Sequence, residues 1–157
     1  MPPRVYVETS VISYLTSRPS RDLVVAGHQQ ITREWWEQRR RAFQLVASQL
    51  VVREAGVGDR ALAKARLEIL AELELLEATD EARELARALI ERGPIHSQAA
   101  EDALHIAIAV ANGVDYLLTW NYKHIANASM RSAIEDECRS QGYAPAVLCT
   151  PEELLEE

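Results

Sequence analysis

The chain has 157 residues, of which 48% are hydrophobic and 26% are charged. This composition is ordinary for a globular protein and argues against disorder, and the length predicts a single domain over residues 1–157. The formal net charge of −7 argues against a general nucleic-acid coat protein, which would present a basic face. It does not exclude a nucleic-acid substrate, because a cation held by acidic residues reverses the local field.

The N-terminal residues, the apolar runs and the cysteines indicate in which cellular compartment the protein is expected. Residues 1–4 lack the basic and apolar regions of a secretory signal, and no apolar run is long enough to cross a bilayer. We therefore expect a cytoplasmic protein with no membrane partner. The two cysteines, Cys138 and Cys149, have no CxxC or Cys/His spacing, which predicts reduced, partly buried thiols rather than a disulfide or a zinc site.

Strands and helices are predicted to alternate from the first residues onward. The pattern predicts, in order, a strand at 4–7, a short helix from 11, a break at 17–20, a largely helical segment at 22–44, and a second strand at 42–47. Thr9 and Ser10 are good N-cap residues for the first helix. Ser48 then begins a helix that ends at Gly56 or Gly58.

The rest of the chain continues this alternation. The pattern predicts, in order, a helix capped by Asp59, a short strand within 73–78, a helix from 79 to the stop at 93–94, an apolar helix at 99–112, a strand at 116–119, a polar helix at 128–141, a strand at 146–148, and a helical turn at 151–155. The helix at 99–112 is hydrophobic on nearly every side, so it must be central to the core.

Strands separated by helices predict a parallel or mostly parallel sheet covered on both faces. In such sheets, binding sites lie beyond the carboxyl ends of the strands, where the strand order switches. Glu8 directly follows the first strand, and Asn121 follows the strand at 116–119. We therefore expect both side chains at the functional edge of the sheet.

Three acidic residues at the ends of apolar elements also have purely structural explanations. Glu8 can be an N-cap carboxylate, Glu54 an exposed helical glutamate, and Asp102 an acid stabilised by a helix dipole. Glu101 points about 100° away from Asp102 around the helix. Its i+4 neighbour, His105, is a plausible partner, and that pairing would leave Asp102 for a site.

Together these acids match a site for a hard divalent cation. Oxygen ligands from distant segments hold Mg²⁺ or Mn²⁺ and leave waters for a substrate phosphate. Other chemistries fit less well, because the sequence lacks GxSxG, GxGxxG, HExxH and a glycine-rich phosphate loop. The four histidines are too dispersed for a ligand set: His105 is typical of a paired or packed histidine, and His124 is a candidate phosphate contact or proton donor.

Four motifs occur in order between Arg4 and Ile125. They are Val7-Glu8-Thr9-Ser10-Val11, Ser48 followed by Glu54, Asp102-Ala103-Leu104-His105-Ile106-Ala107, and Leu118-Thr119-Trp120-Asn121. In their order and spacing these motifs resemble the PIN domain family, in particular the VapC-type toxin ribonucleases of bacterial type II toxin–antitoxin systems. The motifs that contain Asp102 and Asn121 are the more specific ones.

The resemblance implies a three-layer α/β/α fold with a mostly parallel central sheet flanked by helices. It also implies a metal-dependent endoribonuclease that cuts single-stranded RNA with Mg²⁺ or Mn²⁺. The implied catalytic and metal-binding residues are Glu8, Glu54, Asp102 and Asn121. Ser10 or Thr9 would orient Glu8 by hydrogen bonding, and Thr119 would support the site. Asn121 would complete the coordination shell of the metal directly or through a water. The family likeness further implies a homodimer and a partner antitoxin.

Some residues depart from the family pattern. The first position is usually aspartate, so Glu8 is one methylene longer and reaches a cation differently. Asn121 is neutral, which leaves three carboxylates and predicts weaker metal affinity. The segment at 20–42 is longer than in a minimal PIN toxin. It contains Trp35 and Trp36, which point in different directions on a helix. We expect one of them in the core, and the other can anchor a dimer or an antitoxin.

Substrate contacts are expected from residues close to the site. Lys123 and His124 lie nearest and are the preferred candidates for contacts with RNA. The basic run at 39–41 is at least as consistent with a solvated helix face. Trp120 can stack on a base, although a buried aromatic at a strand end fits its position better.

Two alternative functions stay open. In the first, Glu8 and Asn121 have cost the PIN-like fold its catalysis, and the protein is an RNA-binding or assembly module. In the second, it is a metal-dependent phosphatase or nuclease of another α/β type that acts on a small molecule or DNA. Three converging carboxylates would favour the enzymes over the module, and a positive channel would favour the ribonuclease over the phosphatase.

Overall fold

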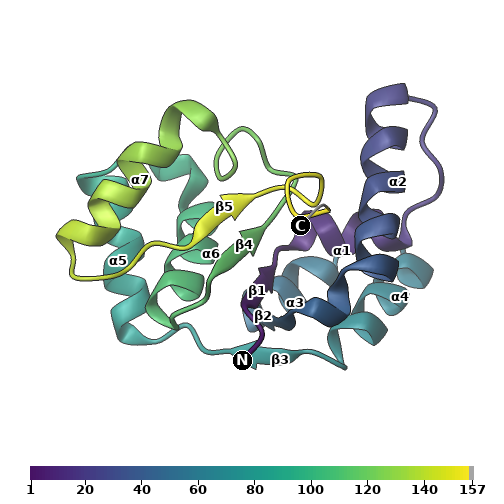
Figure 1. Cartoon of the computed structure of the whole chain (residues 1–157), viewed down its shortest axis with the longest axis horizontal. Coiled ribbons are helices and arrows are strands. Elements are labelled where there is room, and N and C mark those ends of the chain that lie inside the picture. Colours follow the sequence, from purple (N-terminus) through teal and green to yellow (C-terminus); the bar gives the residue numbers. More distant parts are fainter. Residues whose placement is uncertain (156–157) are drawn as a thin grey trace.

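Five parallel strands form one sheet at the centre of the computed structural model, which describes residues 1–155. They are β1 (Arg4–Val7), β2 (Gln44–Ser48), β3 (Glu74–Leu76), β4 (Tyr116–Leu118) and β5 (Val147–Cys149), in the spatial order β3-β2-β1-β4-β5. Val5 of β1 lies opposite Leu45 of β2 on one side and Tyr116 of β4 on the other. The chain therefore builds the sheet outward from β1, first in one direction and then in the other (Figure 1).

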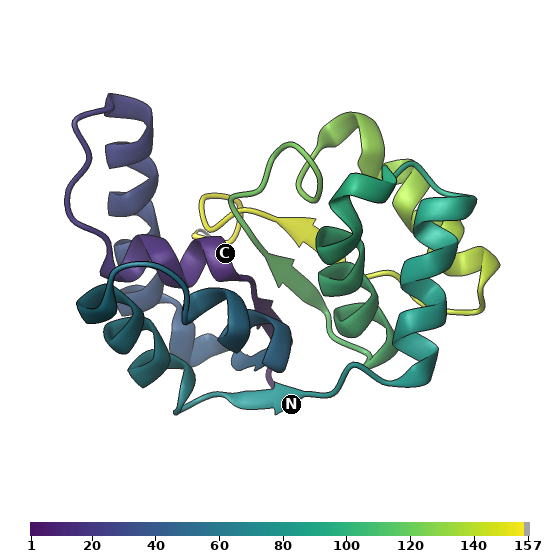
Figure 2. The same cartoon turned by 180° about the vertical axis from the view of Figure 1, so that it is seen from behind.

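The helices form two groups (Figures 1 and 2). One group contains α1 (Thr9–Thr16), α2 (Leu23–Gln38), α3 (Gln49–Ala55) and α4 (Arg60–Leu70), and the other contains α5 (Asp80–Glu91), α6 (Ala100–Ala111) and α7 (Ala128–Ser140). Short 3₁₀ turns lie at Arg40–Ala42 and Ser97–Ala99. Right-handed crossovers place the two groups on opposite faces, because the strand order reverses between them. The predicted three-layer α/β/α fold is confirmed, and its sheet is wholly parallel within residues 1–155.

Side-chain caps begin several helices where the sequence predicted them, but α1 starts at Thr9 with Glu8 as its N-cap, so the prediction of Thr9 or Ser10 as the cap is wrong. Asp22, Asp59 and Thr79 accept backbone N–H groups in the first turns of α2, α4 and α5. Gly113 follows α6 with a φ of 71°, a left-handed conformation that glycine adopts without a steric penalty. The order of elements is confirmed, and most predicted bounds are within a few residues of the observed ones.

The helical segment before β2 ends earlier than predicted. After α2 the chain makes the 3₁₀ turn at Arg40–Ala42 and becomes extended at Phe43. The ring of Phe43 stacks on Trp35 at 5.8 Å, which directs the chain into the sheet. Trp35 is fully buried, whereas Trp36 is half-buried beneath the guanidinium of Arg40, so the prediction that one tryptophan is in the core is confirmed.

The core surrounds β1 and α6. Val5, Tyr6 and Val7 are fully buried. The buried positions of α6 run almost without interruption and are Ala103, His105, Ile106, Ala107, Ile108, Ala109 and Val110. Burial of each large aliphatic side chain contributes about 1.5–3 kcal/mol, so β1 and α6 are firmly held.

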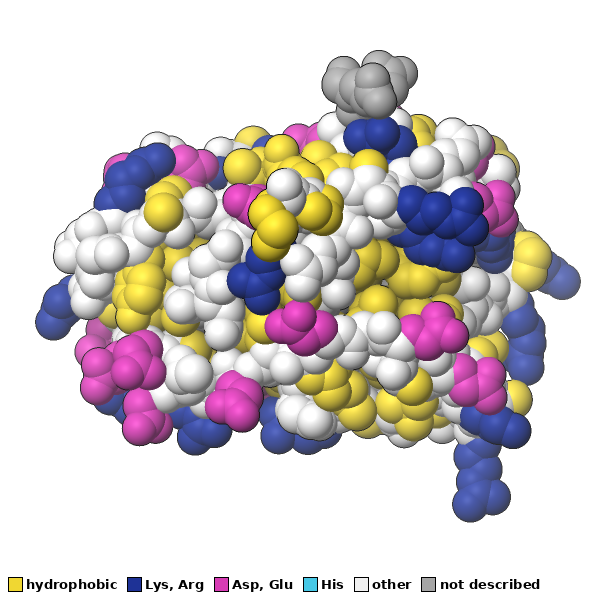
Figure 3. Space-filling model, turned by 60° about the horizontal axis from the view of Figure 1, so that its bottom comes forward, with side chains coloured by type: hydrophobic (Ala, Val, Ile, Leu, Met, Phe, Trp, Pro, Cys, Tyr) yellow, Lys and Arg dark blue, Asp and Glu magenta, His cyan; other side chains and the backbone are white. Residues whose placement is uncertain are grey.

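The surface carries charges of both signs. On the face shown in Figure 3, acidic and basic side chains are mixed, and hydrophobic side chains lie between them. None of the helices within residues 1–155 is long and apolar enough to span a membrane. Cys138 and Cys149 are unpaired and buried, as predicted, and burial raises the pKa of both thiols.

Candidate metal and active site

Polar side chains gather beyond the carboxyl ends of β1 and β4, the neighbouring strands at which the strand order switches direction. Glu8 follows β1 directly, and Thr119 and Asn121 follow β4. Parallel α/β sheets bind their ligands at this position. The topology thus explains how Glu8 and Thr119, 111 positions apart, come within hydrogen-bond distance.

Glu8 is held through one of its carboxylate oxygens. Oε1 accepts the backbone N–H of Ser10 (3.1 Å), the hydroxyl of Ser10 (2.5 Å) and the hydroxyl of Thr119 (2.6 Å). The first of these bonds makes Glu8 the N-cap of α1. None of the hydrogen bonds within residues 1–155 reaches Oε2, so this buried carboxylate keeps one oxygen available for a ligand.

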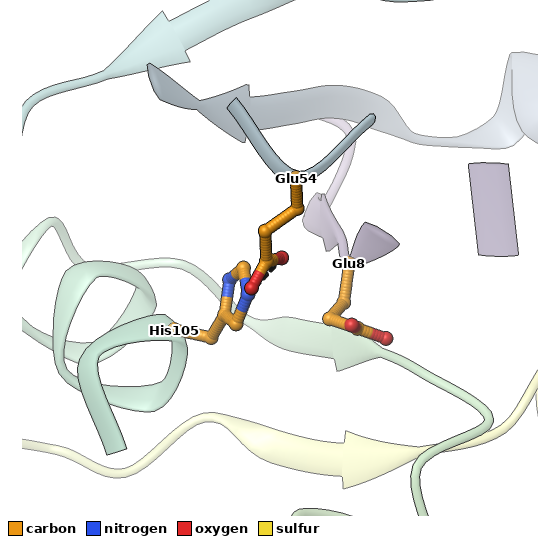
Figure 4. Close-up of side chains that lie close together, drawn as sticks. All are labelled: Glu8, Glu54 and His105. Carbon is orange, nitrogen blue, oxygen red and sulfur yellow. Dashed lines mark hydrogen bonds and ion pairs between the residues drawn. The ribbon is translucent and has the colours of Figure 1, made fainter. Parts of the chain in front are cut away.

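Glu54 projects from α3 toward His105 of α6, with Glu8 beside them (Figure 4). Its Oε1 lies 2.8 Å from Nε2 of His105 and accepts the hydroxyl of Thr9 at 2.5 Å. Burial alone would raise the pKa of Glu54, but the hydrogen bonds from His105 and Thr9 outweigh burial and hold the pKa below its usual range. Glu54 is therefore not the exposed helical glutamate that its position alone suggests.

His105 is fully buried, and both of its ring nitrogens have partners: Nδ1 lies 2.8 Å from the Tyr6 hydroxyl, and Nε2 lies 2.8 Å from Glu54. The predicted pairing of His105 with Glu101 is wrong, because His105 points into the core while Glu101 stays exposed on α6. Glu101 interacts with Glu54 instead, and hydrogen bonding and repulsion by that carboxylate raise the pKa of Glu101.

Asp102 and Asn121 form a hydrogen-bonded pair next to these residues. Nδ2 of Asn121 donates to Oδ1 of Asp102 at 3.0 Å, and Oδ1 of Asn121 accepts the backbone N–H of His124 at 3.1 Å. Burial raises the pKa of Asp102, and the nearby His124 and His105 and the bond from Asn121 oppose this rise. In this geometry the Asn121 amide contacts Asp102 directly and so helps to orient it.

The residues present fit a cation site. Glu8, Glu54 and His105 each place one possible ligand atom within 4.8 Å of the other two. Two carboxylates at this separation suit a hard divalent cation, which prefers oxygen ligands. Asp102 lies outside this group of three, and the charge of Glu54 adds slightly to the burial that raises the pKa of Asp102.

The residues after β4 form the rim of the site. Lys123 is exposed, His124 is half-buried, and the side chain of Tyr122 is 46% exposed. Trp120 is buried and stacks on His28 of α2 with ring centroids 4.1 Å apart, which confirms the prediction of a buried aromatic at this strand end. The long helix α2 thus packs against the segment that carries Asn121.

The basic run at 39–41 lies at the other edge of the sheet. It precedes β2 and so lies near the amino end of that strand, whereas Glu8 and Asn121 follow the carboxyl ends of their strands. Arg39 and Arg40 lie over the rings of Phe43 and Trp36, at 5.5 and 5.1 Å from the centroids. Because all strands of this sheet are parallel, the backbone of this run lies toward the end of the sheet opposite to Glu8, and Arg39 Nε donates to the carbonyl of Leu154 in the C-terminal turn.

Tyr6 is a participant that the sequence reasoning missed. Its hydroxyl lies 2.7 Å from Oγ of Ser48 and 2.8 Å from Nδ1 of His105, and the side chain is fully buried. A signal was available, because a tyrosine hydroxyl inside an apolar strand needs a polar partner. The identity of that partner depends on the strand order, which the sequence does not show.

No family model matches the chain, and no curated protein matches it. Chains of solved structures do match, among them one from the crystal structure of VapBC2 from Rickettsia felis bound to a DNA fragment from their promoter. The TM-score is 0.59 at 16% sequence identity, and the alignment covers 94% of this chain and 98% of that chain. At this identity the likeness shows a shared fold, and it agrees with the three-layer arrangement.

Proposed function

We propose that this protein is a metal-dependent endoribonuclease that hydrolyses RNA phosphodiester bonds with Mg²⁺ or Mn²⁺, and that it is the toxin of a toxin–antitoxin pair. The main support is the convergence of Glu8 and Glu54 at the switch point of a parallel sheet. The motifs that resemble VapC-type toxins, and the shared fold with a chain of the VapBC2 structure, support the same class.

The proposed ligands are Glu8, Glu54 and Asp102, and Asn121 acts on the site through Asp102. A divalent ion bound by such carboxylates lowers the pKa of a water and neutralises charge on a phosphate under attack. Three carboxylates and a neutral amide give fewer negative charges than four acids, so we expect moderate metal affinity.

Hydroxyl groups around the carboxylates provide the preorganisation that such a site needs. Ser10 and Thr119 fix Glu8, and Thr9 fixes Glu54. Hydrogen bonds to ligating carboxylates typically change metal affinity or activity by about 10–100-fold when they are removed. These three residues are therefore assigned supporting roles.

Single-stranded RNA is proposed to bind across the rim after β4. Lys123 and His124 are placed for contacts with phosphates, and the exposed ring of Tyr122 can stack on a base. The Tyr122 ring lies 6.0 Å from that of the buried Trp120, which supports it next to Asn121. The proposed protein partners are an antitoxin and a second copy of this chain.

One observation favours a second candidate, a catalytically weak or inactive RNA-binding or assembly module. The three residues whose possible ligand atoms lie close together include only two carboxylates, Glu8 and Glu54, while Asp102 lies outside this group and is bonded to Asn121 through Oδ1. A site limited to these two would hold a cation less firmly than a site with three carboxylates.

The decisive experiment is cleavage of a structured RNA pool by purified, antitoxin-free protein with Mg²⁺ or Mn²⁺. Wild type is compared with Asp102→Asn and with the matched control Asp136→Asn, which changes an exposed aspartate of α7 that pairs with Arg139. Cleavage that needs the metal, vanishes in Asp102→Asn and persists in Asp136→Asn supports the proposal. Cleavage that survives in Asp102→Asn indicates a contaminant or a misplaced site, and no cleavage by folded protein favours the binding module.

A further inference from the structure

A chain of buried hydrogen bonds runs from β2 through β1 and α6 to Glu54. Oγ of Ser48 lies 2.7 Å from the Tyr6 hydroxyl, which lies 2.8 Å from Nδ1 of His105. Nε2 of His105 lies 2.8 Å from Oε1 of Glu54. Ser48, Tyr6 and His105 are each 0–1% exposed, so water does not compete for these bonds.

The donor in each of these hydrogen bonds can be assigned in turn, beginning with the bond to Glu54. The charged carboxylate of Glu54 only accepts, so Nε2 of His105 carries the hydrogen. In the neutral imidazole, Nδ1 is then an acceptor, so the Tyr6 hydroxyl donates to it and accepts in turn from Ser48. With a neutral imidazole, every polar hydrogen of these three side chains has an acceptor, and donation runs in one direction from Ser48 to Glu54.

Ser48 has a second role that links the chain to the helix of Glu54. Its Oγ accepts the backbone N–H of Val51 at 3.4 Å and so caps α3. The same side chain therefore fixes the start of α3 and the far end of the hydrogen-bond chain. The sheet residue Ser48 thus fixes the start of the helix that carries Glu54, and Ser48 and Tyr6 act on the Glu54 carboxylate through His105 of α6.

We propose that Ser48, Tyr6 and His105 form a buried relay that positions Glu54 for cation binding, and that His105 is a positioning residue and not a metal ligand. The inference rests on the proposed function, because it concerns the same cation site. Both ring nitrogens of His105 are already occupied by protein partners, so ligation by Nε2 would require loss of its bond to Glu54. Hydrogen bonds of this kind orient carboxylate ligands and strengthen metal binding.

The relay is tested by measuring Mn²⁺ affinity of the full chain by titration calorimetry, with thermal unfolding as a check of folding. His105→Leu removes both ring contacts, whereas His105→Gln restores a donor near the position of Nε2. Tyr6→Phe keeps the shape of the ring and removes only the hydroxyl. Gln29→Leu is the matched control, because Gln29 is also buried and makes three hydrogen bonds, but within the segment at 17–29.

We expect His105→Leu to weaken Mn²⁺ binding by about tenfold or more, and His105→Gln to recover most of the loss. Tyr6→Phe should weaken Mn²⁺ binding by about threefold in the wild-type background. It should have no further effect in His105→Leu, because substitutions within one hydrogen-bonded network do not have additive effects. Gln29→Leu should lower the unfolding temperature and leave Mn²⁺ affinity unchanged.

Several outcomes would overturn the relay. Wild-type affinity in folded Tyr6→Phe and His105→Leu would show that Glu54 needs no positioning. If both His105 variants lose affinity equally while Tyr6→Phe binds Mn²⁺ as the wild type does, His105 acts as a ligand and the relay is wrong. These results leave the proposed cation site intact, whereas a wild-type protein that binds no Mn²⁺ removes both the site and the relay.

Discussion

Glu8 combines two roles that substitutions can separate. It caps α1 and accepts hydrogen bonds from Ser10 and Thr119, and it is a proposed cation ligand. Glu8→Ala removes both roles. Glu8→Gln keeps an oxygen that can accept the same donors but removes the charge. We expect Glu8→Ala to be clearly destabilised and Glu8→Gln to stay near wild-type stability, while both variants lose metal-dependent cleavage.

The size of the effect follows from the three donors. Loss of an N-cap costs about 1 kcal/mol, and a buried donor without an acceptor costs about 1–3 kcal/mol. The fully buried Thr119 hydroxyl loses its acceptor, whereas the half-buried Ser10 hydroxyl can turn toward Oγ1 of Thr119, 3.5 Å away. We therefore expect Glu8→Ala to cost about 3 kcal/mol, which lowers the Tm of a domain of this size by about 6–12 °C.

The assay is urea unfolding followed by circular dichroism in the presence of EDTA, so that bound metal does not contribute. The matched control is Glu68→Ala, which changes an exposed glutamate of α4 and should alter stability by less than about 0.5 kcal/mol. Equal stability of Glu8→Ala and wild type would refute the hydrogen-bond reasoning. Equal destabilisation in Glu8→Gln would show that charge, and not an acceptor at this position, stabilises the fold.

Three further predictions concern charge and packing. Asp102→Asn should raise the urea midpoint of the metal-free protein and abolish RNA cleavage, because it removes a carboxylate whose pKa is raised by burial. The pKa of Glu54 is lowered from 4.5 to about 2, so its stabilising contribution is present above pH 4.5 and is lost as the pH falls toward 2; urea titrations should show a smaller loss over this range in Glu54→Gln. A Cβ at Gly93 would lie 2.7 Å from the carbonyl oxygen of Leu89, whereas a Cβ at Gly27 meets nothing within 4 Å. Thermal unfolding should therefore show Gly93→Ala destabilised by about 1–3 kcal/mol and Gly27→Ala unaffected or stabilised.

Local signals predicted the order and type of most elements of the fold. Asp59 and Thr79 were recognised as helix starts because capping is a property of a few neighbouring residues. The apolar pattern of α6 identified the central helix for the same reason. The position of Glu8 after the first strand, together with the alternation of strands and helices, then located the expected edge of the sheet.

Contacts across the sheet could not be predicted in the same way. The i,i+4 rule paired Glu101 with His105, but this rule treats the helix as isolated and takes no account of the interior that α6 faces. In the structure His105 meets Tyr6 and Glu54, which lie on elements whose order in the sheet is invisible in the sequence. The bond between Asp102 and Asn121 was missed for the same reason.

The pairing of β1 with β4 has a consequence for how the protein is made. Val7 lies opposite Leu118, and the backbone N–H of Glu8 donates to the carbonyl of Leu118. While a ribosome is still translating the first two thirds of the message, one side of β1 has no strand to bond to, and Thr119 does not yet exist to fix Glu8. A chain terminated before residue 118 therefore leaves one side of β1 unpaired and lacks both Thr119 and Asn121.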